Sequence, residues 1–281
     1  MKICRFKGPY GPRIGVLEGR DTVADLGTAT LKEIFDAASP KEHIRHLADQ
    51  TRLSMPVGNL EFLAPVEHQE VWAAGVTYLR SKAARMEESE TSASLYDRVY
   101  AAERPELFFK SLPEKVVAHR GNVGIRKDAK WNVPEPELAL VLNSHGKVVG
   151  YTIGNDMSSR DIEGENALYL PQAKVYKGSC ALGPFIEIGS TEEQARAWTI
   201  TLQIWRGGQQ VFGGETSVSQ IKRTFTELAG FLYRSQEFAH GSVLLTGTGI
   251  IPPDDFTLAD HDKVIIEISG IGSLTNTVTV V

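Results

Sequence analysis

The chain of 281 residues contains only two cysteines, Cys4 and Cys180. Two cysteines are too few for a disulfide framework, and their separation excludes a CxxC metal or redox motif. We therefore expect a protein of a reducing compartment. The stretch Met1 to Gly8 lacks the apolar core of a signal peptide, and no apolar run approaches the length of a membrane span. These absences predict a soluble, cytoplasmic protein with no membrane partner.

Basic tracts are also missing. The 30 lysines and arginines are outnumbered by 35 aspartates and glutamates, which gives a formal net charge of −5. A mildly acidic chain without a basic patch argues against a nucleic-acid partner. The seven histidines have no G-x-S-x-G motif to accompany them, so the sequence does not indicate a Ser-His-Asp hydrolase.

The composition that remains is that of an ordinary globular protein, with 42% hydrophobic and 23% charged residues. Short β-compatible runs dominate, and they lack the regular βα alternation of a doubly wound parallel sheet. We predict a β-rich α+β fold. Because Pro56, Gly58 and Pro65 mark a linker, we place a small N-terminal α+β domain in residues 1–65 and a catalytic domain in residues 66–281.

Three acidic residues are brought together by the strand pattern in the middle of the chain. Glu135 and Glu137 begin one apolar run, and a second apolar run ends just before Asp156. We interpret the two runs as an antiparallel hairpin in which Leu142 lies opposite Val148. Side chains two residues apart point to one face of a strand. Glu135 and Glu137 should therefore project together, with Asp156 arriving from the neighbouring strand.

The same register places Glu135 opposite Asn155, beside Asp156. Three carboxylates at one place repel one another, so a compensating charge is needed. A hard divalent cation such as Mg²⁺ is the simplest compensation for an oxygen-rich, nitrogen-free site. The alternative is a solvated strand edge, which Pro136 would also suit.

Lys174 and Glu106 are the candidates for proton transfer. Lys174 lies in a mostly uncharged stretch and is either a surface lysine or, beside a bound dication, a base or donor with a lowered pKa. Glu106 precedes Phe108 and Phe109, and is either a surface acid or a carboxyl group with a raised pKa against an aromatic wall. The residues alone leave both choices open.

Two further segments could contact a substrate. The glycine turn from Thr246 to Gly249 is either a simple turn or a place where backbone N–H groups approach a carboxylate. Arg160 could pair with Asp161 or hold a substrate carboxylate with two hydrogen bonds. The substrate-binding candidates are Tyr78, Arg160, Gln172 and Thr248.

Taken together, these motifs resemble the fumarylacetoacetate hydrolase family over about residues 70–281. The resemblance implies a mixed β-roll that usually forms a homodimer or a dimer-based oligomer. It also implies Mg²⁺ or Mn²⁺ held by Glu135, Glu137 and Asp156, a site lysine at Lys174, and a small α-keto acid or β-diketone substrate. The matching segments are Glu135-x-Glu137, Gly150-Tyr151-Thr152, Asn155-Asp156-x-Ser158-x-Arg160-Asp161, Lys174, Leu182-Gly183-Pro184 and Thr246-Gly247-Thr248.

One departure separates this chain from the hydrolases of that family. They carry Asn-Tyr-x-x-His after the first strand, and this histidine activates water, whereas here Ser81 stands in its place. Segments 104–110, 134–138 and 165–174 are similar to a branch that also lacks the histidine, the 2-keto-3-deoxy-D-arabinonate dehydratases. That branch implies catalytic roles at the Glu106 and Lys174 positions. It also implies loss of water through a metal-stabilised enolate, giving 2,5-dioxopentanoate.

Two alternatives remain at this point. The first is another activity of the family on an α-keto acid or diketone, as an acylpyruvase, a C–C bond hydrolase or a keto-acid decarboxylase. The second is a metal-dependent keto-acid binder without catalysis. Release of CO₂ or of a cleaved acid would indicate the first, and tight binding of pyruvate without turnover would indicate the second.

Overall fold

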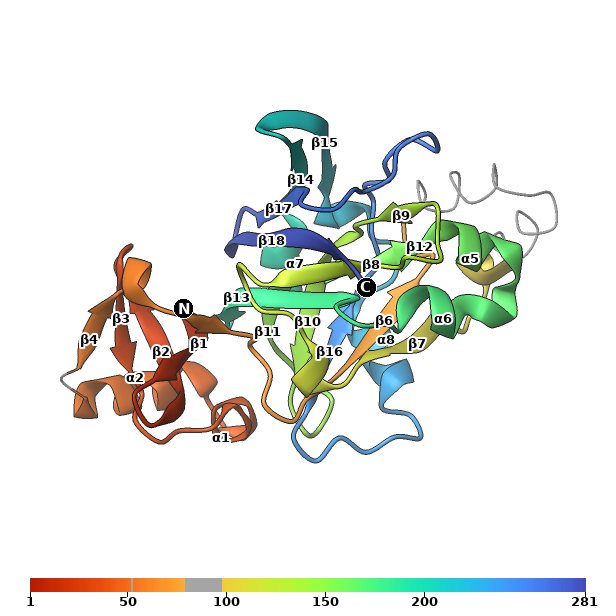
Figure 1. Cartoon of the computed structure of the whole chain (residues 1–281). Helices are drawn as coiled ribbons and strands as arrows, with labels where there is room; N and C mark the ends of the chain where they lie inside the picture. Colours follow the sequence, from red (N-terminus) through yellow and green to blue (C-terminus); the bar gives the residue numbers. More distant parts are fainter. Residues whose placement is uncertain (52, 79–97) are drawn as a thin grey trace.

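The structure, a computed structural model, describes residues 1–51, 53–78 and 98–281. A mixed sheet of 11 strands runs through the molecule in the order β4-β3-β2-β1-β13-β11-β10-β16-β6-β7, with β5 beside β1. A second sheet of five strands, β15-β14-β17-β18-β8, packs against it, and β9 and β12 form a small pair (Figure 1). The predicted β-rich α+β class is confirmed.

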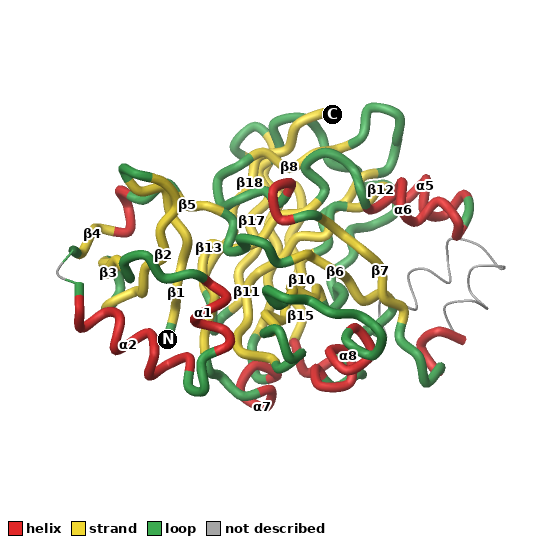
Figure 2. Tube along the Cα trace, turned by 90° about the horizontal axis from the view of Figure 1, so that it is seen from below, coloured by secondary structure: helices red, strands yellow, loops and turns green. Residues whose placement is uncertain are grey.

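The N-terminal segment forms one end of the large sheet, with two helices beside it (Figure 2). The first helix begins after Thr30, where Glu33 completes a capping box. Ile34 and Phe35 of this helix are buried against the strands. The elements are β1 (Lys2–Gly8), β2 (Gly11–Glu18), β3 (Thr22–Asp25), α1 (Leu31–Asp36), α2 (Pro40–Gln50), β4 (Ser54–Pro56) and β5 (Phe62–Leu63).

This segment shares its sheet with the rest of the chain. β1 pairs with β13 (Cys180–Ile188), so that Lys2 lies opposite Glu187 and Cys4 lies opposite Phe185. The strand order is therefore continuous across the linker that the sequence predicts. The sheet has no break at residue 65, and the assignment of residues 1–65 to a small domain of their own stays a proposal.

The remaining strands surround a fully buried central strand, β10. All seven of its residues are buried, because β10 lies between β11 and β16 and has apolar clusters on both faces. Leu138 and Leu140 face the largest cluster, whereas Ala139 faces another. The strands are β6 (Glu70–Gly75), β7 (Glu106–Ser111), β8 (Asn122–Ile125), β9 (Asn132–Val133), β10 (Pro136–Leu142), β11 (Val148–Asp156), β12 (Ser158–Ser159), β14 (Thr199–Arg206), β15 (Gln209–Ser217), β16 (Ser242–Leu245), β17 (Lys263–Ile268) and β18 (Gly272–Val280).

The helices of the second part are short. No helix in the described ranges is both long and apolar enough to cross a bilayer. Two of them, which the sequence did not predict, follow β12 and lead to Lys174. The helices are α5 (Arg160–Glu165), α6 (Leu170–Lys174), α7 (Glu192–Arg196) and α8 (Phe225–Leu232).

The β10–β11 hairpin is confirmed, but its register differs from the prediction. Leu142 lies opposite Val148 as expected, and a β-bulge beside this pair shifts all the other pairs by one residue. The prediction that Glu135 lies opposite Asn155 is therefore wrong. Asp156 instead donates its backbone N–H to the carbonyl of Glu135 at 3.0 Å. The bulge thus brings two of the acidic residues directly beside each other.

Candidate metal centre and active site

Three buried carboxylates converge where β10 begins and β11 ends. Glu135 precedes β10, Glu137 lies within it, and Asp156 is the last residue of β11. One oxygen atom from each carboxylate lies within 4.8 Å of the others. A compact donor set made only of carboxylate oxygens suits Mg²⁺ or Mn²⁺. The residues therefore fit the metal that the sequence predicted.

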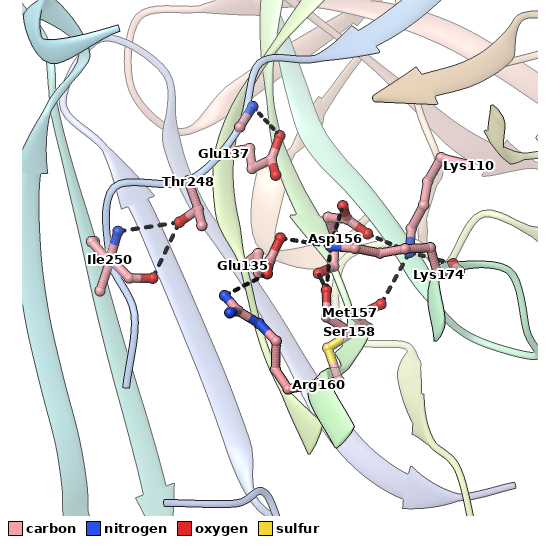
Figure 3. A network of polar contacts seen from close by, with 11 residues as sticks. Lys110, Glu135, Glu137, Asp156, Met157, Ser158, Arg160, Lys174, Thr248 and Ile250 are labelled. Atoms are coloured by element: carbon pink, nitrogen blue, oxygen red, sulfur yellow. Dashed lines mark hydrogen bonds and ion pairs between the residues drawn. The ribbon is translucent and has the colours of Figure 1, made fainter. Parts of the chain in front are cut away.

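Buried cations from other elements also neutralise these carboxylates (Figure 3). Lys174 Nζ donates to Glu135 Oε2 at 2.8 Å, to Asp156 Oδ2 at 3.0 Å and to Ser158 Oγ at 2.5 Å. The Arg160 guanidinium forms a 2.8 Å ion pair with Glu135 Oε1. Neither cation lies on β10 or β11, so the spacing of the hairpin gave no sign of them. The repulsion is already reduced by side chains that follow these strands in the chain.

Lys110 is a third cation at the site, and the sequence reasoning missed it. Its side chain is fully buried, its Nζ donates to the carbonyl of Met157 at 3.0 Å and to the carbonyl of Lys174, and it pairs with Asp156. The pairing of β7 with β6 skips Lys110. A bulge of this kind redirects a side chain. The available signal was a lysine inside an apolar, strand-like run.

The glycine turn after β16 holds a carboxylate of the site. The backbone N–H of Gly247 donates to Glu137 Oε2 at 2.6 Å. Burial raises the pKa of the Glu137 carboxyl group, and the neighbouring Asp156 and Glu135 carboxylates raise it further. Gly247 has a φ of +90°, and a Cβ there would overlap Thr77 Oγ1. The turn therefore requires glycine to bring its amide to Glu137.

A narrow cavity lies over the carboxylates, and its walls include Gly75, Phe108 and Thr248. Lys174 also lines it, with Nζ 5.8 Å from the centre of the Phe108 ring. Glu106 lines a neighbouring hollow of about 320 Å³, and its carboxylate lies against Gly75. Lys174 therefore lines the cavity itself, whereas Glu106 lines the neighbouring hollow and contacts the cavity wall at Gly75.

Of the four predicted substrate-binding residues, two line the cavity and two do not. Thr248 and Arg160 line the cavity, although the Arg160 guanidinium is engaged by Glu135. Tyr78 is fully buried in the core, where burial raises the pKa of its phenol, and Gln172 is exposed on α6. Neither is among the described residues that line the cavity. Ser81, which stands where the hydrolytic histidine would be, lies outside the described residues.

Several known proteins are similar to this chain in sequence. The family profile described as fumarylacetoacetate (FAA) hydrolase C-terminal matches residues 70–279. A probable 2-keto-3-deoxyxylonate dehydratase of Haloferax volcanii is 45% identical over 217 residues, which cover 77% of this chain and 74% of the relative. A 2-dehydro-3-deoxy-D-arabinonate dehydratase of Saccharolobus solfataricus is 40% identical over 224 residues, which cover 79% of this chain and 75% of the relative.

The solved structures include similar folds over the full length. A 2-keto-3-deoxy-D-arabinonate dehydratase complexed with magnesium and 2,5-dioxopentanoate aligns with a TM-score of 0.83 and 33% identity. The alignment covers 100% of this chain and 99% of that chain. The similarity therefore includes the N-terminal segment as well as the region matched by the family profile.

Proposed function

The chain belongs to the fumarylacetoacetate hydrolase family, and from this premise we propose that it is a divalent-metal-dependent dehydratase of 2-keto-3-deoxy sugar acids. The observation that carries the proposal is the convergence of Glu135, Glu137 and Asp156 on one buried site. Lys174 and Glu106 lie beside this site and supply the ionisable groups that a hydro-lyase needs. The relatives at 45% and 40% identity carry dehydratase names, which favours dehydration over the other activities of the family.

The chemistry divides between the metal and the side chains. When bound, Mg²⁺ supplies a Lewis acid that polarises the C2 ketone and makes the C3 protons more acidic. Glu135, Glu137 and Asp156 would hold it. Lys174 or Glu106 removes one C3 proton, and the C4 hydroxyl leaves with a proton from an acid, for which Glu106 is the simplest choice.

The overall reaction removes one molecule of water from the substrate. One proton leaves C3 and one hydroxyl leaves C4, and the resulting unsaturated keto acid tautomerises to a dioxo acid. For a 2-keto-3-deoxypentonate of the arabinonate type the product is 2,5-dioxopentanoate, the compound present in the similar solved structure. Arg160 and Thr248, which line the cavity, are our candidates for substrate contacts, whereas Tyr78 and Gln172 do not line it and would have to move to reach a substrate.

The same premise suggests how the protein is organised in the cell. We infer a homodimer, or an oligomer built from dimers, in the cytoplasm. The resemblance to the family supports this inference. Light scattering on the purified full chain would check the oligomeric state, and a mass equal to one chain would contradict it.

The decisive experiment follows the product by mass. Protein treated with EDTA should be inactive on 2-keto-3-deoxy-D-arabinonate, and addition of Mg²⁺ or Mn²⁺ should restore the loss of one water. Glu137→Gln should abolish metal binding in calorimetry while the circular dichroism spectrum persists. Full turnover without metal would refute metal dependence. Release of CO₂ or of a cleaved acid would indicate another activity of the family.

A further inference from the structure

Gly75 and Glu106 face each other at the open end of the β6–β7 strand pair. Gly75 is the last residue of β6, Glu106 is the first residue of β7, and the two are cross-strand partners. A Cβ atom built on Gly75 would lie 2.7 Å from Glu106 Cδ and closer still to Oε2. The Glu106 carboxylate therefore occupies the space that any other side chain at position 75 would need.

Backbone conformation does not explain why this position is glycine. Gly75 has no φ in the left-handed region, in contrast to Gly247 with a φ of +90°. An alanine at position 75 would therefore be free of backbone strain. The three atoms nearest to its Cβ would all belong to Glu106. Space for the carboxylate is the property that glycine supplies here.

The place of this contact links it to the chemistry. Gly75 forms part of the wall of the cavity that also contains the three carboxylates and Lys174. Glu106 lines the adjoining hollow together with Glu163 and Leu170. A Glu106 side chain that lies across Gly75 therefore ends beside the cavity. A side chain displaced from Gly75 would end farther from it.

We propose that Gly75 is a positioning residue. Because it has no side chain, it leaves the space in which the Glu106 carboxylate lies when it reaches toward the substrate. This inference rests on the proposed function, which assigns proton transfer to Glu106. The requirement is steric, so it concerns the place of the carboxylate and not its charge. Displacement of a reacting group by about 1 Å can lower a rate by about 10²-fold.

The test is Gly75→Ala in the full chain. Because the three atoms nearest to the new Cβ belong to one side chain and not to the backbone, the fold should persist. Mg²⁺ affinity in calorimetry should be unchanged, since no carboxylate of the metal site is touched. The value of kcat should fall by about 10- to 10²-fold. Gly58→Ala is the matched control, because a Cβ at Gly58 meets no atom within 4 Å, and it should retain wild-type kcat.

A double-mutant cycle separates positioning from a general structural effect. If Gly75 acts through Glu106, the double variant Gly75→Ala/Glu106→Gln should have the same kcat as Glu106→Gln alone. Losses that multiply would overturn the proposal, as would wild-type turnover of Gly75→Ala while Glu106→Gln is impaired. In both of those cases the proposed function stands. Wild-type turnover of Glu106→Gln would instead refute the role of Glu106, and the role of Gly75 with it.

Discussion

Lys110 shows how much a single buried side chain contributes to this site. Its ammonium group contacts the Asp156 carboxylate and the carbonyls of Met157 and Lys174, and the side chain has no exposed surface. It therefore links β7 to the end of β11 and to the end of α6. The three partners use the three N–H bonds of the ammonium group.

Replacement of this lysine should destabilise the protein strongly. Lys110→Met leaves the Asp156 carboxylate buried without one of its cations, and loss of one partner of a buried ion pair costs about 3–5 kcal/mol. Urea unfolding of metal-free protein would measure the change. The control is Lys7→Met, whose partner Glu61 is exposed, and which should change the free energy of unfolding by less than about 1 kcal/mol. Equal effects of the two substitutions would contradict the role given to Lys110.

Lys174 and Glu106 can be distinguished by their separate steps. Lys174→Met and Glu106→Gln should each lower kcat by about 10²–10⁴-fold, because each removes a general acid or base. Both variants should retain metal binding. Exchange of the C3 proton in D₂O then identifies the base: a variant that lacks only the acid still exchanges this proton, whereas a variant that lacks the base does not. Near-wild-type turnover of both would place the site elsewhere.

The sequence identified the residues whose spacing is local. Glu135 and Glu137 are two apart on one strand, so period-two geometry placed them on one face. The hairpin predicted that Asp156 lies nearby, but Asp156 shares that face only because the bulge shifts the register by one residue. Lys110 was not predicted, because its position depends on a bulge that the pairing of two strands creates. Ser158, which accepts from Lys174 at 2.5 Å, was missed because nothing in the sequence shows where that lysine points.

Among the elements, the turn after β16 contacts the metal centre through a backbone amide. Gly247→Ala would place a methyl group against Thr77 and strain a residue with a φ of +90°. Its amide would then no longer reach Glu137 at 2.6 Å. We expect about tenfold weaker Mg²⁺ binding in calorimetry, together with about 1–2 kcal/mol of lost stability.

A substitution at a second glycine serves as a control that distinguishes backbone strain from an effect on Mg²⁺ binding. Gly208 also has a positive φ, of +83°, but a Cβ there meets no atom within 4 Å. Gly208→Ala should therefore lower stability to a similar degree and leave Mg²⁺ affinity unchanged. If both variants bind Mg²⁺ equally well, the Gly247 amide does not hold Glu137 for the metal.

Irregular elements limited the prediction of the fold. The continuous apolar run of β10 and its turn were sufficient to place the hairpin, including the Leu142–Val148 pair. The bulge beside that pair lies next to Gly150, a residue type that often marks bulges inside strands, and it shifted the register by one residue. Helix α6 has only five residues, so its packing and not its periodicity forms it. For this reason the sequence did not show that Lys174 ends a helix.

At the scale of the whole molecule, His119 connects the linker region to the second sheet. Its Nδ1 accepts a hydrogen bond from the Thr275 N–H at 3.1 Å, and its ring meets the Phe62 ring edge-on at 5.7 Å. Burial and, to a smaller extent, the neighbouring Arg120 charge lower the pKa of His119 to about 4. The folded protein therefore keeps this imidazole neutral.

This shift predicts a loss of stability in mild acid. Between its unfolded pKa of about 6.5 and its folded pKa of about 4, His119 binds more protons in the unfolded state, so stability falls as the pH falls through this window. Above about pH 6.5 the contribution is fully present. His119→Phe keeps the ring but cannot titrate, so its thermal midpoint should fall less between pH 7 and pH 5. Parallel decreases for both proteins would show that His119 does not govern this pH dependence.

The pairing of β1 with β13 limits how the N-terminal segment could be gained or lost in evolution. Deleting residues 1–65 would uncover the backbone N–H and C=O groups of Phe185 to Glu187 on a mostly buried strand. An uncovered apolar edge is a template for aggregation. We therefore expect a gene fragment that encodes only the family-matched region 70–279 to yield a polypeptide that aggregates. A lineage could gain or lose the N-terminal segment only together with charges, a bulge or a partner that protects this edge.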